Sequence, residues 1–210
     1  MGAYIDLSVS PKTPDAVYEI ARMAERLGYS GVGLPSGLYE LLEGRSKPTE
    51  VRLYRRRYYE VRSPGDISRA VSAARPGELL VVKPVGVQAY RRAGKIRRVS
   101  AIRLEPDSMV RPDRSERNLF AERGWGVIEI SLRPLLAGDR DYLKWFYEVV
   151  GRAFKVGIRV AFVSDAEDPL ELWHPAQVAA LVSSLGLPPE LGLMGLTSAP
   201  SAAIAGVRTD

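Results

Sequence analysis

Short apolar runs alternate along this chain with amphipathic stretches of helical period. The first run, residues 3–9, is followed by Pro11 and by a stretch from about Thr13 to Leu27 whose apolar side chains share one face, with Gly28 as its stop. The same pairing recurs toward the other end of the chain. The runs that predict strands are residues 3–9, 31–34, 51–61, 79–82, 99–104, 127–130, 158–163 and 191–196.

Helices are predicted between these runs. One follows Pro64, where Ile67, Val71 and Ala74 fall on one face, and the longest is strongly amphipathic. The other ranges that predict helices are residues 13–27, 38–42, 87–93, 113–123, 139–154, 175–185 and 200–207.

About eight strand and helix units in succession predict a parallel sheet, and that number favours a closed barrel over an open, doubly wound sheet. The chain has 210 residues, whereas such barrels take about 250. We therefore expect an α/β fold in which residues 1–210 form a single compact, TIM-like barrel domain, irregular in one or two units and without a separate linker.

Composition excludes several classes of protein. No apolar stretch approaches the roughly 18 residues of a membrane span, and the first residues lack an export pattern, so we expect a soluble, cytoplasmic protein. The absence of cysteine excludes disulfides and thiolate chemistry, and His174 is the sole histidine. Scarce amides beside abundant arginine and proline are typical of thermophiles.

The distribution of charge predicts a polyanionic partner. The formal charge is +5 and the pI is about 9.5, and no acid lies between Glu78 and Glu105 in a tract rich in lysine and arginine. Phosphate is the natural counter-ion of such a tract. The alternative is a solvated face that pairs with distant acids such as Glu105, Glu122 or Glu129.

A second basic cluster surrounds three consecutive arginines, Arg55 to Arg57. Tyr54, Tyr58 and Tyr59 flank them and resemble a platform on which RNA bases could stack. The same tyrosines could equally pack on the outside of the barrel.

Asp6, Ser8 and Ser10 lie at the end of the first predicted strand, where barrel folds place catalytic residues. In the metal-dependent barrels of the polymerase-and-histidinol-phosphatase group, two histidines alternate on this strand. Here Ser8 and Ser10 take those positions, and serine hydroxyls with one distant histidine cannot rebuild a site for several metals. We therefore predict no metal site and no catalytic residue in this chain.

Two further features have both a chemical and a structural interpretation. The carboxylates of Asp165, Glu167 and Asp168 could coordinate a cation or act as an acid and base, or they could cap the following turn and orient neighbouring arginines. His174 could act as a lone general base, or it could simply precede a helix.

The second half of the chain resembles the archaeal ribonuclease P protein component 3 family, whose eukaryotic relative is the thirty-kilodalton subunit of the same enzyme. The resemblance lies in residues 128–136 before a long helix, residues 160–166, and the segment from Leu172 to Pro175 before a helix that ends in Leu185-Gly186-Leu187. The opening is similar to the family too, with an aspartate in the first strand and a Leu-Gly-Tyr sequence at residues 27–29.

This resemblance implies a barrel of the metal-dependent phosphoesterase type that has lost its metal ligands. It implies assembly with ribonuclease P RNA, with ribonuclease P protein component 2 and with other ribonuclease P proteins, and contact with precursor tRNA only indirectly. Mg²⁺ is then expected on the RNA of the holoenzyme, and this chain binds no cofactor of its own. Family members often carry an arginine where this chain has Trp173, so any RNA contact made there in relatives must be made otherwise here.

The leading hypothesis is thus an RNA-binding subunit of ribonuclease P, the endonuclease that removes the 5′ leader from precursor tRNA. The candidate RNA-binding residues are Arg52, Arg55, Arg56, Arg57, Lys83, Arg91, Arg92, Lys95, Arg97, Arg98, Arg103 and Arg133. One alternative is a stand-alone barrel phosphohydrolase that uses Asp6, Asp165 and His174 on a small phosphorylated substrate. The other is a scaffold that binds proteins only.

Overall fold

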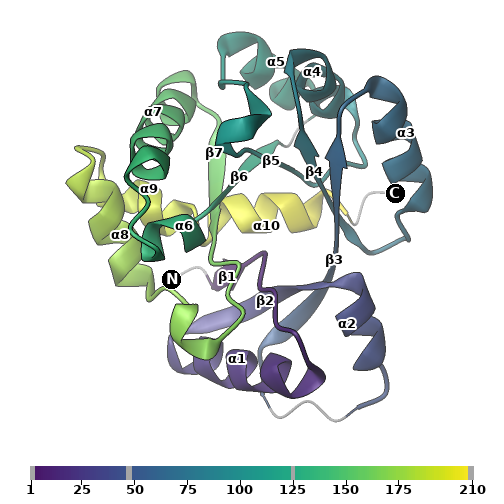
Figure 1. The fold of residues 1–210 in the computed structure, drawn as a ribbon, viewed down its shortest axis with the longest axis vertical. Helices are drawn as coiled ribbons and strands as arrows, with labels where there is room; N and C mark the ends of the chain where they lie inside the picture. Colours follow the sequence, from purple (N-terminus) through teal and green to yellow (C-terminus); the bar gives the residue numbers. More distant parts are fainter. Residues whose placement is uncertain (1–2, 46–48, 124–125, 208–210) are drawn as a thin grey trace.

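A computed structural model describes residues 3–45, 49–123 and 126–207 of the chain. Parallel strands follow one another around a nearly closed barrel in chain order, each hydrogen-bonded to the next, with helices around them (Figure 1). This confirms the predicted TIM-like α/β barrel. The strands are β1 (Tyr4–Asp6), β2 (Tyr29–Pro35), β3 (Arg52–Val61), β4 (Leu79–Pro84), β5 (Ala101–Arg103), β6 (Val127–Ser131) and β7 (Arg159–Val163).

The helices begin where the sequence supplies caps. Thr13, Ser63 and Asp139 each accept a hydrogen bond from a backbone N–H of the first turn that follows. The α-helices are α1 (Pro14–Arg26), α2 (Ser36–Leu41), α3 (Pro64–Ala73), α4 (Val87–Lys95), α5 (Arg114–Arg123), α6 (Arg133–Leu136), α7 (Arg140–Val156), α8 (Pro175–Ser184), α9 (Pro189–Met194) and α10 (Ser198–Ala205). Two short 3-10 helices are η1 (Pro106–Ser108) and η2 (Pro169–Glu171).

The predicted eighth strand, residues 191–196, is wrong, because most of this segment forms α9. A short apolar run can form either structure, and here Pro189 in the first turn favours a helix. Gly192 allows α9 to lie against α8, since a Cβ at Gly192 would stand 2.8 Å from the Cα of Ala179. Close packing between two helices therefore replaces strand pairing at this position.

The gap between β1 and β7 is closed in two places. Toward the carboxyl ends of the strands, the N–H of Ser10 donates to the carbonyl of Ala166 over 2.7 Å. Toward the amino ends, the N–H of Ile5 donates to the carbonyl of Leu196, and the N–H of Phe162 donates to the carbonyl of Gly195. The turn after α9 thus occupies the place of an eighth strand and nearly completes the barrel.

Inside the barrel, the layer nearest the amino ends of the strands is apolar. Alternate strand residues point inward, and α10 covers them from the amino ends of the strands through Ala199 and Ala203 (Figure 1). The inward residues in this cluster are Ile5, Leu7, Leu79, Val81, Ala101, Val127, Ala161 and Val163. Because α10 and this layer fill the amino end, the accessible mouth of the barrel lies at the carboxyl ends of the strands.

None of the helices in the described part of the chain has the length and apolar character needed to cross a membrane.

Candidate functional site

A layer of charged side chains lies inside the barrel above the apolar layer. It follows from the period of two along each strand, because the next inward position after Val81, Ala101 or Val127 is a charged residue. The layer consists of Arg56, Lys83, Arg103, Glu129 and Asp165. The structure therefore brings together, at the mouth, the candidates Arg56, Lys83 and Arg103, of which the first and last are 47 positions apart in sequence.

Arg103 is the centre of this layer. Its guanidinium pairs with Glu129 at 3.0 Å and Glu105 at 3.2 Å, and it forms a shorter pair with Asp165. Burial acts to lower the pKa of Arg103, but the surrounding carboxylates outweigh it and hold the pKa well above its usual value. Burial likewise acts to raise the pKa of Asp165, yet Arg103 brings that pKa down to about 2. Both groups are therefore charged at neutral pH.

Lys83 is neutralised by three acids. Its ammonium lies 2.6 Å from Asp107, 3.0 Å from Glu105 and 3.4 Å from Glu60. Burial acts to lower the pKa of Lys83, but the hydrogen bonds to Asp107 and Glu105 raise it above the ordinary lysine value. Lys83 and Arg103 therefore form ion pairs with acids of this chain. This agrees with the alternative interpretation of the basic tract, in which its cations pair with distant acids.

Ser8, two residues after β1, and Ser131, at the end of β6, are structural hydrogen-bond donors here. The Ser8 hydroxyl donates to Asp165 over 2.5 Å, and Ser131 donates to the other oxygen of the same carboxylate over 2.7 Å. Asp6 accepts the backbone N–H groups of Ser8 and Ser164, and its burial raises its pKa to about 7. Within residues 3–45, 49–123 and 126–207, no group of three metal-ligating side chains is placed to hold a metal ion.

The mouth itself is a cavity of about 540 Å³. Its rim carries Arg133, which pairs with Glu167 at 2.5 Å, and Tyr58, whose side chain is partly exposed. The hydrogen bond from Arg133 lowers the pKa of Glu167 to about 2. The residues that line the cavity are Ser10, Pro35, Ser36, Arg56, Arg57, Tyr58, Arg103, Glu105, Arg133, Asp165 and Glu167. This lining holds four arginines and three carboxylates, and Arg56 and Arg57 also pair with Glu129 and Glu78, which lie outside the lining.

The remaining candidates on β3 divide between ion pairs and the surface. Arg55 pairs with Glu43 at 2.6 Å, and Arg57 pairs with Glu78 at 2.9 Å. Arg52 is exposed, and its guanidinium lies 5.1 Å from the centre of the Tyr54 ring. An arginine stacked on a tyrosine at the surface can still contact phosphate through its N–H groups.

The four candidates Arg91, Arg92, Lys95 and Arg97 form a separate exposed group on α4 and the turn after it. No carboxylate of the described residues forms an ion pair with any of them. Arg98 differs, because its guanidinium donates to the carbonyls of Glu78 and Arg75 over 2.8 and 2.6 Å. The candidates thus lie in three places: the barrel mouth, β3 and the outer face of α4, the last being the most open to a polyanion.

The acids after β7 and His174, for which the sequence left both a chemical and a structural role open, make structural contacts. Asp168 caps η2 by accepting the N–H of Leu170, while Asp165 and Glu167 hold arginines. His174 is exposed, and its Nδ1 accepts the N–H of Ala176 as the cap of α8. It does not line the barrel mouth, so the structure does not join it to Asp165.

Trp173 packs against the hydrophobic core outside the barrel mouth. Its side chain is partly buried against the core, and its carbonyl accepts the Tyr29 hydroxyl over 2.8 Å. Burial raises the pKa of Tyr29, which keeps this hydroxyl a donor. This position therefore offers no cation to a ligand.

Comparison with solved structures concerns the fold. One chain of the cryo-EM structure of an archaeal ribonuclease P with mature tRNA superposes with a TM-score of 0.75 at 15% identity, covering 97% of this chain and 90% of that chain. The crystal structure of an uncharacterized protein gives a TM-score of 0.58 at 12% identity, covering 98% of this chain and 75% of that one.

Comparison of sequences identifies the family. The ribonuclease P protein component 3 of Aeropyrum pernix is 38% identical over 190 residues, which cover 88% of each chain. A family model described as RNase P subunit p30 matches residues 3–209. Because this match spans nearly the whole chain, the resemblance predicted from the sequence is confirmed, and the protein belongs to the RNase P subunit p30 family.

Proposed function

We propose that this chain is an RNA-binding subunit of ribonuclease P and that the outer face of α4 is its principal contact with the catalytic RNA. Membership of the RNase P subunit p30 family supports the assignment to this enzyme. The observation that carries the RNA contact is the exposed group Arg91, Arg92, Lys95 and Arg97, which meets no carboxylate of the described residues in an ion pair. Such a group releases counter-ions when it binds phosphates.

In this proposal the chain positions RNA and takes no part in the chemistry. The carboxylates of the mouth are neutralised by Arg103, Arg56 and Lys83, so they are poor metal ligands and poor proton acceptors. Cleavage of the precursor tRNA phosphodiester is then the work of Mg²⁺ held on the RNA of the holoenzyme. The protein contributes charge neutralisation and orientation.

The partners follow from the same proposal. They are ribonuclease P RNA, ribonuclease P protein component 2 and other ribonuclease P proteins, with precursor tRNA reached through the assembled complex. Support comes from the relatives, one a ribonuclease P protein component 3 and one a chain in an archaeal ribonuclease P structure with mature tRNA. We further propose that the protein acts with these partners in the cytoplasm. Its scarce amides and its networks of charges favour a thermophilic source.

A salt titration with a matched control tests the α4 contact. The variant Arg91→Ala/Arg92→Ala should bind ribonuclease P RNA at least about tenfold more weakly, and its plot of log affinity against log salt should be flatter by about 1.5. The control Arg22→Ala/Arg26→Ala removes two exposed cations from α1, at the far side of the barrel in Figure 1, and should bind as the wild type does. Equal affinities and slopes for all three proteins would overturn the contact.

Reconstitution tests the assignment to the enzyme. Cleavage of precursor tRNA by the cognate RNA and partner proteins should require this chain and should weaken with Arg91→Ala/Arg92→Ala. Hydrolysis of a small phosphorylated substrate by the purified chain without RNA would support the stand-alone phosphohydrolase instead.

A further inference from the structure

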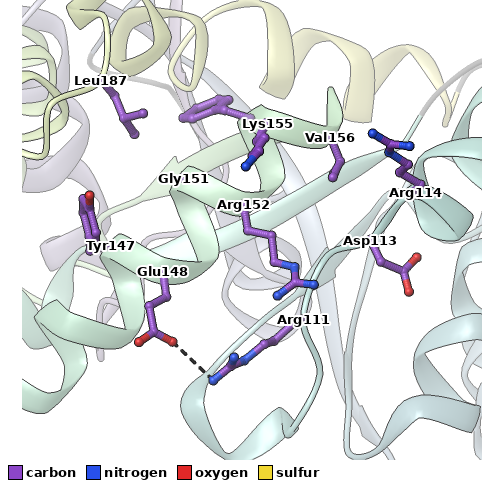
Figure 2. A pocket seen from close by; sticks show the side chains of 11 residues that line it. Arg111, Asp113, Arg114, Tyr147, Glu148, Gly151, Arg152, Lys155, Val156 and Leu187 are labelled. Carbon is purple, nitrogen blue, oxygen red and sulfur yellow. Dashed lines mark ion pairs between the residues drawn. The ribbon is translucent and has the colours of Figure 1, made fainter.

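A broad groove lies on the outside of the barrel, away from the mouth. Its volume is about 1,010 Å³, and it runs between α7 and the segment that leads into α5 (Figure 2). The residues that line it are Arg111, Asp113, Arg114, Tyr147, Glu148, Gly151, Arg152, Phe154, Lys155, Val156 and Leu187. None of the RNA-binding candidates predicted from the sequence is among them.

The two acids of the groove are already engaged. Glu148 pairs with Arg111 at 3.2 Å, and the Asp113 carboxylate accepts the N–H of Glu116 over 2.9 Å in the first turn of α5. In contrast, no carboxylate of the described residues pairs with Arg114 or Lys155. The groove therefore keeps positive charge for a ligand from outside the chain.

Arg152 is held in place for such a ligand. Its Nε donates to the carbonyl of Pro112 over 2.9 Å, which ties α7 to the segment before α5, and Figure 2 shows its side chain extending toward that segment. The terminal nitrogens of a fixed guanidinium can bind an anion with little loss of conformational entropy. The cation is thus positioned before any ligand arrives.

The groove combines these cations with an aromatic ring. Tyr147 is 51% exposed on α7, and Phe154, Val156 and Leu187 supply apolar surface beside it. Cations for phosphates and an exposed ring for a base are the two requirements of a site for single-stranded nucleic acid. A protein partner fits less well, because the excess of four cations over two acids in this lining needs a counter-charge, which the phosphates of RNA supply at every nucleotide.

The cations continue beyond the groove. A smaller hollow at the end of α7 is lined by Arg117 and Arg159. Arg117 lies three residues after Arg114 and shares its face of α5, and α5 packs against α4, which carries the exposed group described above. Exposed cations therefore occur on α4, α5 and α7.

We propose that this groove binds a single strand of RNA, with backbone phosphates on Arg114, Arg152 and Lys155 and a base stacked on Tyr147. The inference rests on the proposed function, because the strand would belong to the RNA that α4 contacts. It adds a second site, on different helices, that recognises an unpaired strand.

Oligouridylate labelled with fluorescein is the probe for this site, with affinity measured by anisotropy over a range of KCl concentrations. Arg114→Ala/Lys155→Ala should weaken binding about tenfold and flatten the salt plot by about 1.4, since each phosphate contact on a single strand contributes about 0.7. Tyr147→Ala should weaken binding at least about fivefold, whereas Tyr147→Phe keeps the ring and should bind as the wild type does. The changed side chains are exposed, so the variants should melt as the wild type does.

Crosslinking locates the strand directly. An oligomer containing 4-thiouridine should crosslink, on irradiation, to residues 145–152, which trypsin releases as one peptide by cleaving after Lys144 and Arg152. Crosslinks confined to other peptides would overturn the inference.

The outcomes separate this inference from the proposed function. If Arg91→Ala/Arg92→Ala impairs RNA binding while the groove variants match Arg22→Ala/Arg26→Ala, the groove is not an RNA site and the proposed function stands. If the wild-type chain binds neither oligouridylate nor ribonuclease P RNA, both fail. If the groove variants keep RNA affinity but lose binding to protein component 2, the groove is a protein interface and the inference is overturned.

Discussion

Arg103 and Asp165 form a largely buried ion pair that links β5 to the segment after β7 inside the barrel. The same guanidinium also holds Glu129, a side chain with no exposed surface. Replacing Arg103 would therefore leave two carboxylates in a poorly solvated interior without this counter-charge, which costs far more than the intact pair contributes.

The variant Arg103→Met should lose about 3–5 kcal/mol of unfolding free energy. Arg103→Lys keeps the positive charge, so it should lose less unfolding free energy than Arg103→Met. It should still be less stable than the wild type, because one ammonium cannot contact all three carboxylates as the planar guanidinium does. Urea denaturation of both variants at pH 7 measures the difference. A loss below about 1 kcal/mol for Arg103→Met would mean that this ion-pair network does not hold the barrel together.

Asp165 provides a test of the non-catalytic mouth. The variant Asp165→Asn removes the charge that Arg103 and Ser8 contact, so the melting temperature of the protein should fall. The rate constant for precursor tRNA cleavage by the reconstituted enzyme, measured below that temperature with saturating protein, should stay within about twofold of the wild type, because the group only positions its neighbours. A loss of a hundredfold or more would instead make Asp165 a catalytic residue.

The sequence predicted the barrel well where local signals agree. Asp139 caps α7 as an acid before an amphipathic stretch should, and the apolar run in β6 lies where predicted. The prediction of residues 191–196 as a strand fails because an apolar run of six residues has no distinguishing period. Here Pro189 in the first turn and the close packing of Gly192 on α8 favour the helix.

The charges were harder to interpret because their partners are distant in sequence. Lys83 and Arg103 lie in a tract without acids, yet Glu60 and Glu129 reach them from neighbouring strands. The groove was missed for the opposite reason. Its cations are dispersed along the sequence, and the signal that the sequence offers is the spacing of three between Arg114 and Arg117, which places both on one face of α5.

Asp6 predicts an unusual dependence of stability on pH. Burial raises its pKa to about 7 in the folded protein, whereas an unfolded aspartate has a pKa of about 3.9. Between these values the folded state holds a proton that the unfolded state has released, so stability falls as pH rises, by on the order of 1 kcal/mol per pH unit. This is opposite to the effect of an ion-paired carboxylate such as Asp165.

The variant Asp6→Asn should lose this slope between pH 4 and pH 7, because an amide does not titrate. Asp15→Asn changes an exposed aspartate in the first turn of α1 and should keep the wild-type slope. Unfolding free energies from urea titrations at several pH values give the comparison. Parallel curves for all three proteins would show that Asp6 is ionised in the folded state at neutral pH.

Gly33 of β2 and Gly37 of α2 form a matched pair for testing how the first strands pack. A Cβ at Gly33 would stand 2.0 Å from the carbonyl oxygen of Leu7, and this backbone atom cannot rotate away as a side chain can. The variant Gly33→Ala must therefore push β1 from β2 and should lose about 3 kcal/mol or more of unfolding free energy. Gly37 is exposed, and a Cβ there meets nothing within 4 Å, so Gly37→Ala should be neutral or gain up to about 1 kcal/mol from helix propensity. Thermal and urea denaturation of the two variants compare the same chemical change in a crowded and an open position, and similar effects at both would contradict the close approach of β1 to β2.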